Sequence, residues 1–133
     1  MKYEERATFR IPKKNGRKGP GPELMGANTL IGEKVHNMHD EHLGDIKEVM
    51  LDMRTGKVAY AVLSFGGAFT IGEKLFAVPW SALKLDTVDK GFVLDVEKHR
   101  FEIAPGFASN DWPSMVDQGW ADYIHEYYGI SAS

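Results

Sequence analysis

The chain has 133 residues, 43% of them hydrophobic and 26% charged, which is the length and composition of one globular domain. It contains no cysteine, so disulfides, zinc ribbons, thiol nucleophiles and iron–sulfur clusters are excluded, whereas the redox compartment stays open. No apolar run approaches the roughly 20 residues that cross a bilayer, and the amino end has no apolar stretch of signal-peptide length. We therefore expect a soluble cytoplasmic protein without a transmembrane segment. Peripheral association is the one kind of membrane contact that this expectation leaves open.

The formal net charge of −3 is unevenly distributed. Residues 1–23 hold seven basic side chains against three acidic ones, a local charge of +4, which leaves −7 for residues 24–133. Their content of Pro, Gly, Lys and Arg predicts a flexible basic arm over residues 1–25. Such an arm either docks on an anionic partner, such as nucleic acid or an acidic lipid surface, or serves as a solubilising tail or folds against its own acidic domain. Because no aromatic residue interleaves the basic ones between residues 12 and 23, the sequence disfavours nucleic acid.

From about residue 28 onward, short apolar segments alternate with turn signals. A brief strand over residues 34–37 precedes a polar hairpin tip at 38–42, and Gly56 supplies the positive φ of a turn at 52–57. The segment 58–65 is almost wholly apolar, which is typical of a central strand buried on both faces. Further strands are predicted at residues 43–52, 74–80, 83–85 and 91–96. About six short strands with turns between them predict a mainly β fold, a small antiparallel barrel or sandwich.

The carboxyl-terminal part has a helical pattern instead. Residues 97–102 predict a short helical turn, and Asn110 or Asp111 caps a helix that begins near residues 112–113. An apolar stripe at helical spacing follows, and Gly129 stands where a helix stop belongs. The stripe consists of Trp120, Tyr123, Ile124 and Tyr127. This helix packs either on the chain's own strands or on a neighbouring subunit, and the sequence leaves both open.

Several segments of this pattern resemble the PRC-barrel family, named for the cytoplasmic domain of the photosynthetic reaction centre H subunit. The resemblance covers residues 28 to 94 and rests on Leu30-Ile31-Gly32 opening the first strand, Leu43-Gly44-Asp45-Ile46 with Val49 and Leu51-Asp52, the run from Thr55 to Val62, and the run from Gly72 to Leu83. The tail is similar to the extension of stand-alone bacterial members in Ala104-Pro105-Gly106-Phe107, Trp112-Pro113 and Tyr127-Tyr128-Gly129. The resemblance implies a small antiparallel PRC-type β-barrel of about six strands over residues 26–103 and a C-terminal helical extension over 104–133.

The resemblance implies an assembly or docking module rather than an enzyme. In reaction centre H subunits the barrel looks like a cap on a membrane complex, and in ribosome maturation factors a similar barrel follows an RNA-processing domain and contacts a ribosomal protein. This chain has neither a transmembrane helix nor room for that partner domain, so only the general role is carried over. The family supplies no catalytic residue, and we expect no cofactor.

Three histidines form the pattern H-x-x-H-x-x-H. His36, His39 and His42 enclose Asp40 and Glu41, and imidazoles with carboxylates are suitable ligands for zinc or nickel. Steps of three residues drift around a helix and alternate between the faces of a strand, so only a curled hairpin tip gathers the three rings. The alternatives are a metal site and a solvated turn, and the sequence favours the turn.

A glycine-rich loop at residues 66–72 carries large apolar side chains. Its likeness to a phosphate-binding loop fails because Glu73 separates the second glycine from Lys74. Its apolar residues either form an exposed patch that docks a partner or fold over the barrel mouth. The candidates for partner binding are therefore Phe65, Phe69, Ile71, Trp120, Tyr123 and Tyr127.

No motif for nucleophilic catalysis surrounds Ser64, Ser81 or Ser114, and the carboxylates are scattered over turns and strand edges. We therefore expect a non-enzymatic module for protein–protein interaction or complex assembly, which binds a protein partner of unknown identity. A homo-oligomer, a dimer above all, is the expected state. The open alternatives are a small-molecule or metal-binding barrel and a ribosome- or RNA-associated factor that acts through the basic arm.

Overall fold

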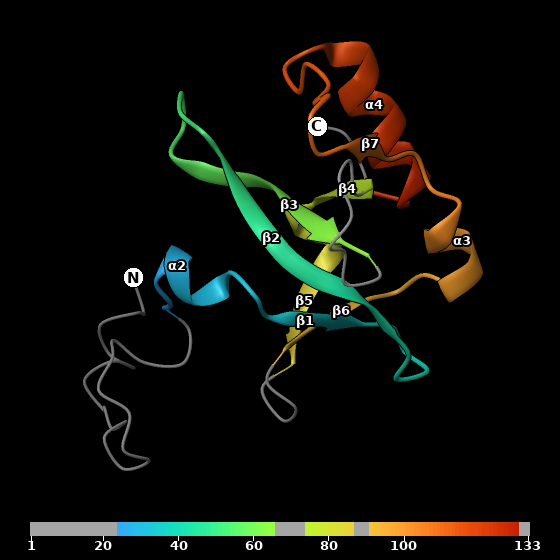
Figure 1. The fold of residues 1–133 in the computed structure, drawn as a ribbon. Helices are drawn as coiled ribbons and strands as arrows, with labels where there is room; N and C mark the ends of the chain where they lie inside the picture. The colour runs from blue at the N-terminus through green and yellow to red at the C-terminus, as the bar shows by residue number, and fades with distance from the viewer. Residues whose placement is uncertain (1–23, 66–73, 87–90, 131–133) are drawn as a thin grey trace. The chain divides into compact units, whose positions relative to one another are not determined.

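The computed structural model describes residues 24–65, 74–86 and 91–130 (Figure 1). Contacts divide the chain between residues 30 and 31, and the two units are described separately. In the first unit, α2 (Ala27–Leu30) is a single turn. The prediction that Leu30 opens the first strand is wrong, since Leu30 ends this helix. Most of the predicted basic arm, residues 1–23, lies outside the described residues.

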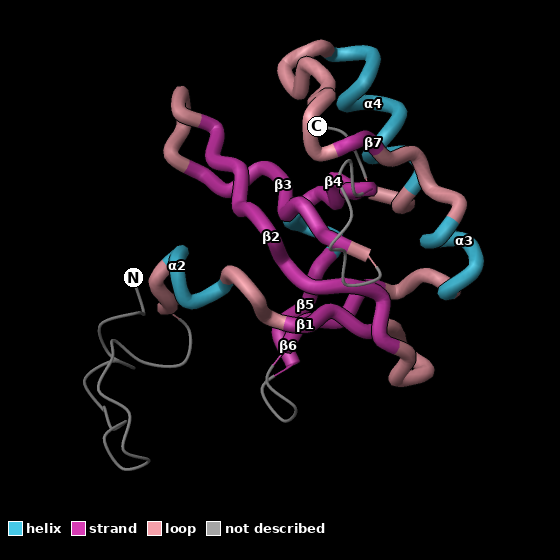
Figure 2. Tube along the Cα trace, viewed as in Figure 1, coloured by secondary structure: helices cyan, strands magenta, loops and turns pink. Residues whose placement is uncertain are grey.

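The second unit is built on one seven-stranded sheet with the order β5-β6-β1-β2-β3-β4-β7. The strands are β1 (Lys34–His36), β2 (His42–Asp52), β3 (Lys57–Ser64), β4 (Lys74–Pro79), β5 (Leu83–Asp86), β6 (Gly91–Leu94) and β7 (Phe107–Ala108). A short 3₁₀ turn (Trp80–Ala82) joins β4 to β5, and the helices are α3 (Lys98–Glu102) and α4 (Gln118–Tyr127). Figure 2 shows β2 and β3 extending together beyond β1 as a long hairpin.

The mainly β prediction is confirmed, and the antiparallel six-stranded barrel is corrected in two respects. The sheet has a seventh strand, β7, and β1 pairs with β6 in parallel. In the described ranges the hydrogen-bonded order is open, because no pairing joins β5 to β7. On one side β6 pairs antiparallel with β5, which directly precedes it in the chain. On the other side it pairs in parallel with β1, which is far from it in the sequence. Local patterns carry no information about such a contact.

The third strand is the centre of the core, as its apolar sequence predicts. Four successive residues of β3, Tyr60 to Leu63, are buried, so both faces of this strand are covered. Val62 pairs with Ala77 and Leu63 with Phe76 across the β3–β4 ladder. Because opposite residues share a face and neighbours alternate, Tyr60 and Ala77 lie on one face and Phe76 on the other.

The Phe76 face is covered by α3. Phe101 of α3 is completely buried, and its ring centroid lies 4.6 Å from that of Phe76. Phe65, just after β3, completes this phenylalanine cluster with centroids 6.4 Å from Phe76 and 6.1 Å from Phe101. The predicted helical turn at 97–102 is thus confirmed, and its one buried side chain fixes it to the sheet.

The Tyr60 face is covered by α4. Ile124 is buried against Tyr60 and Ala77, and Trp120 packs on the same cluster with its ring 5.2 Å from that of Tyr60. The question left open by the sequence is therefore answered for this side of the helix: it packs on the chain's own sheet. The Tyr128 side chain packs there too.

Between the two helices, β7 covers the edge of β4. Leu75 pairs with Phe107 and Lys74 with Ala108 in antiparallel register. A Cβ added to Gly106 would stand 2.7 Å from the carbonyl oxygen of Leu75, so this close approach requires glycine. We call the segment from α3 through β7 to α4 the C-terminal clamp, because it holds β4 from both faces and from the edge.

The predicted start of α4 is wrong and its predicted end is confirmed. The carboxylate of Asp117, not Asn110 or Asp111, caps the helix by accepting hydrogen bonds from the N–H groups of Gly119 and Trp120. At the other end Gly129 has φ +72°, and its N–H donates to the carbonyl of Glu126 in a Schellman motif. An aspartate six residues beyond the predicted cap was a signal of the same kind, and local pattern could not choose between them.

The phenylalanine cluster makes a prediction about stability. Phe101→Ala removes a fully buried ring from between α3 and β4, and we expect the free energy of unfolding to fall by about 3–5 kcal/mol in urea denaturation. The matched control is Ile103→Ala two residues later, where the side chain is 63% exposed and the change stays within about 0.5 kcal/mol. Equal losses in the two variants would contradict the role of Phe101 in holding the clamp.

Candidate protein-interaction surface

Among the exposed large apolar side chains of the second unit, two groups lie next to one packing cluster. At the tip of the β2–β3 hairpin, Leu51 is 49% and Met53 84% exposed. In the segment before α4 and on the helix itself, Val116 is 84% and Tyr123 55% exposed, and Trp112 is partly exposed as well. Contiguous patches of such side chains often mark interaction sites. These five residues are called the candidate surface below.

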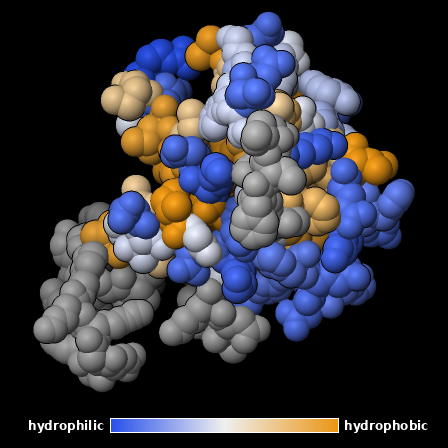
Figure 3. Space-filling view, viewed as in Figure 1, coloured by the Kyte–Doolittle hydropathy of each residue, from blue (hydrophilic) through white to orange (hydrophobic). Residues whose placement is uncertain are grey.

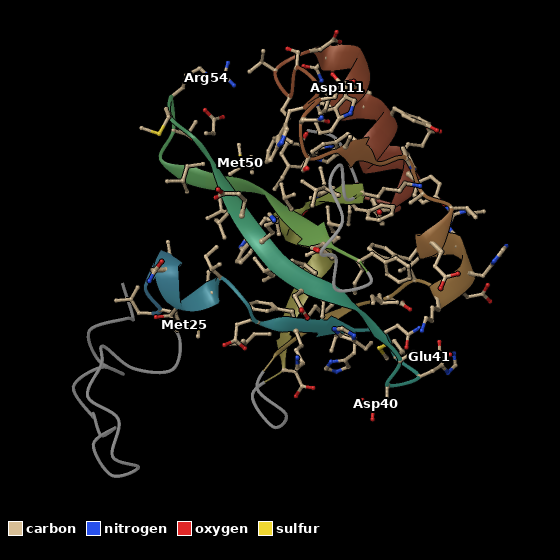
Figure 4. All side chains as sticks on the ribbon, viewed as in Figure 1. Met25, Asp40, Glu41, Met50, Arg54 and Asp111 are labelled. Atoms are coloured by element: carbon tan, nitrogen blue, oxygen red, sulfur yellow. The ribbon has the colours of Figure 1, made fainter. Side chains whose placement is uncertain are left out.

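The two halves of the candidate surface flank one common cluster. Met50 from the hairpin and Met115 from the segment before α4 both pack against Tyr60, Ala77 and Ile124. Figure 4 places Met50 on β2 below the hairpin tip with Arg54, and Asp111 in the segment that leads to α4. Figure 3 shows apolar side chains gathered over the hairpin and polar ones over much of the remaining visible face.

The hairpin tip is held by a local ion pair. Nε of Arg54 donates to Oδ1 of Asp52 at 3.1 Å and Nη2 donates to Oδ2 at 3.2 Å, while the backbone N–H of Arg54 also donates to Oδ1 at 2.9 Å. The Arg54 side chain, with this backbone bond, lowers the pKa of the Asp52 carboxyl. Gly56 has the positive φ that the sequence predicts, +79°. The tip therefore has a defined conformation although its side chains are exposed.

The aromatic stripe predicted on the last helix divides among three environments. Trp120 packs on Tyr60, as described above, and Ile124 is buried. Tyr123 points away from the sheet and belongs to the candidate surface. Tyr127 lies against Arg100, whose guanidinium carbon is 4.2 Å from the ring centroid. Of the three helical candidates, Tyr123 is the most exposed, whereas Trp120 and Tyr127 also make contacts within the chain.

Arg100 and Tyr127 join the two helices of the clamp reciprocally. Nη2 of Arg100 donates to the carbonyl oxygen of Tyr127 at 2.7 Å, and the Tyr127 hydroxyl donates to the carbonyl oxygen of Arg100 at 2.7 Å. With the cation–π contact, these bonds fix the end of α4 to α3. Tyr127 is therefore occupied within the chain.

Of the three candidates near the glycine-rich loop, one is described. Phe65 is half-buried in the phenylalanine cluster, so its ring contributes to the attachment of α3. Phe69 and Ile71 lie outside the described residues. Of the two alternatives for this loop, an exposed patch or packing within the chain, the contacts of Phe65 favour the second for this residue.

The three histidines are not brought together. His36 of β1 lies 3.2 Å from Oδ2 of Asp86, and His42 of β2 lies 2.8 Å from Oδ1 of Asp45. His39 is exposed in the turn between β1 and β2, where its backbone N–H donates to the side chain of the buried Asn37. Asn37 organises this turn and thereby separates the rings. Among the residues that the structure describes, no group of three histidine or carboxylate side chains could hold a metal ion.

The hairpin half of the candidate surface escaped the sequence prediction. Leu51 stands near the end of a predicted strand, and its exposure follows from β2 extending beyond β1, a length that local periodicity does not fix. Met53 falls in the turn that was predicted at residues 52–57. Val116 stands where the helix was expected to have begun.

Comparison with known families settles the class of the domain. The family model for the PRC-barrel domain matches residues 22–100. The chain belongs to the PRC-barrel domain family. No curated protein gives a significant match. None of the helices in the described ranges is both long and apolar enough to cross a membrane.

The match ends one residue before Phe101. The hairpin half of the candidate surface therefore lies in the matched region, whereas Val116, Tyr123 and nearly all of the clamp lie beyond it. This PRC-barrel domain thus carries an added segment that is integrated into its core through Phe101 and Ile124.

Tyr128 predicts a dependence of stability on alkaline pH. Its hydroxyl is buried and has no hydrogen-bond partner among the described residues, and burial raises the pKa of the phenol far above its ordinary value of 10.0. The folded chain thus retains a proton that the unfolded chain loses, so the free energy of unfolding falls as the pH rises above about 10.

We expect Tyr128→Phe to reduce this alkaline loss and, at neutral pH, to leave stability unchanged or raise it by up to about 1 kcal/mol, because an unpaired buried hydroxyl is removed. Urea denaturation at a series of pH values measures both effects. Tyr123→Phe is the control, since that hydroxyl is on an exposed side chain. A clear loss of stability in Tyr128→Phe at neutral pH would mean that the hydroxyl has a partner.

Proposed function

We propose that this PRC-barrel domain is a non-enzymatic module for protein–protein interaction, which docks a protein partner through the candidate surface. The observation that carries the proposal is the exposure of Leu51, Met53, Val116 and Tyr123 around one shared packing cluster. A surface anchored on a rigid core presents its apolar groups without a large ordering cost on binding.

Two properties of the surface support docking rather than a small-molecule site. Its apolar side chains project from convex elements, a hairpin tip and a helix, and aromatic and methionine side chains are typical anchors of protein interfaces. Polar groups surround them, among them Asp52, Arg54 and Asp122, which suit the rim of such an interface. The absence of catalytic motifs in the sequence points the same way.

The test is affinity capture with the full chain in its native host, followed by binding of the recovered protein to purified variants. We expect the double variant Val116→Lys and Tyr123→Lys to weaken binding at least tenfold, because both side chains enter the contact (~1.4 kcal/mol or more). Met38→Lys is the matched control, since Met38 is 68% exposed but lies in the turn between β1 and β2.

Binding that is equally strong in both variants would remove the helical half of the candidate surface from the interface. Recovery of no protein partner, together with a monomeric wild type, would overturn the proposed function itself. Circular dichroism of each variant keeps unfolding apart from loss of binding, and both sites are exposed enough to accept lysine.

A further inference from the structure

The outer half of β2 has an open edge. β2 pairs with β3 from Asp45 to Asp52, but on its other side β1 reaches only the first residues of the strand. The last hydrogen bonds on that side join Ile46 to Glu33 and Gly32. Over residues 47–52, no strand in the described part of the chain lies beside this edge (Figure 2).

A bulge explains where the edge opens. The β2–β3 register shifts between Ile46 and Glu48, so Lys47 is the extra residue of β2. Bulges bend a strand and increase its twist, and this one coincides with the point where β2 leaves β1. Beyond it, alternate N–H and C=O groups of β2 face away from β3 with no described backbone partner.

Only the middle of this edge lacks the features that usually block an open edge. Bulges, prolines and charged side chains are such features, and here the bulge at Lys47 with Glu48 stands at one end and Asp52 at the other. Residues 49–51 between them are Val-Met-Leu. Met50 packs into the core, so Val49 and Leu51, its neighbours in the strand, share the opposite face. Such an edge is suited to pairing with another strand.

The charge of the hairpin favours a second copy of the chain as the partner. Residues 24–133 carry −7, so two bodies repel one another over most of their surface. Residues 47–57 carry three basic and two acidic side chains, a local charge of +1, which leaves −8 for the rest of the body. Two copies therefore meet less charge repulsion hairpin to hairpin than across the acidic remainder of residues 24–133.

We propose that the outer edge of β2 pairs antiparallel with the same edge of a second copy, about a two-fold axis at Leu51. This proposal rests on the proposed function and names one partner of the module, the chain itself. In this register Leu51 meets its own counterpart, and Val49 of each copy lies diagonally beside Leu51 of the other. The pairing satisfies the open backbone groups at the outer end of β2, which ends at Asp52, and buries Val49 and Leu51 of both copies.

The first experiment uses the fact that the chain has no cysteine. Opposite residues of an antiparallel pair have Cα atoms roughly 4.5–5.5 Å apart, which is within the range of a disulfide. We expect Leu51→Cys to form a disulfide-linked dimer on mild oxidation at low protein concentration. Ile103→Cys, at a comparably exposed site on the clamp, should stay largely uncrosslinked under the same conditions. Equal crosslinking of the two variants would overturn the proposal.

The second experiment measures the mass in solution. Light scattering should give twice the monomer mass for the wild type and a monomer for Leu51→Lys, with Ile103→Lys unchanged. A dimer untouched by Leu51→Lys, or one lost equally in Ile103→Lys, contradicts this interface.

The outcomes separate the two proposals. A monomeric wild type over the accessible concentration range overturns the dimer. If that monomer still binds a recovered partner through Val116 and Tyr123, the proposed function stands without it. Binding of a partner that is abolished by Leu51→Lys in a monomeric protein would show that a strand of another protein occupies the edge instead.

Discussion

Packing of Phe101 on Phe76 is the contact on which the arrangement of the carboxyl-terminal third depends. Phe76 lies on β4, the neighbour of the edge strand β7, and Phe101 is the only fully buried side chain of the five-residue helix α3. A helix so short has no stability of its own, so tertiary packing must hold it. Once α3 is fixed, the chain is directed along β4 as β7 and then across to the Tyr60 face as α4.

The two neighbours of β3 in the sheet, β4 and β2, differ in how far the rest of the chain covers them. β4 is covered on both faces by helices and at its edge by β7, with Gly106 allowing the backbones to approach. β2 is paired on one side only over its outer half, and the chain supplies no described strand for the other. Four buried residues of β3 between these two strands make the sheet rigid there. The open edge is therefore held in place by a well-packed core, which is the condition for strand pairing with little ordering cost.

How far the sequence predicts this structure depends on the range of the interactions involved. The apolar runs at 58–65 and 74–80 predicted β3 and β4 within one residue. A strand that is buried on both faces has apolar side chains along its whole length, so its own sequence reveals it. β7 is two residues long and exists only because β4 offers an edge, and the parallel β1–β6 pair joins residues far apart in the chain. At the candidate surface, helical spacing predicted Tyr123 in one stripe with Ile124, whereas the structure buries Ile124 and exposes Tyr123. Leu51 was missed because its exposure depends on where β1 stops, and Met53 lies in the turn after β2.

The origin of the two halves of the candidate surface bears on how this domain differs from its family. Leu51 lies within the matched region and Tyr123 outside it. One side of the ten-residue helix α4 packs on the core through Ile124 and Trp120. Tyr123, on another side of the helix, is exposed. The clamp therefore stabilises the sheet and, by the same helix, presents a face that lies outside the residues matched by the family model. Under the proposed function, this face would distinguish the partner of this chain from partners bound through the matched region alone.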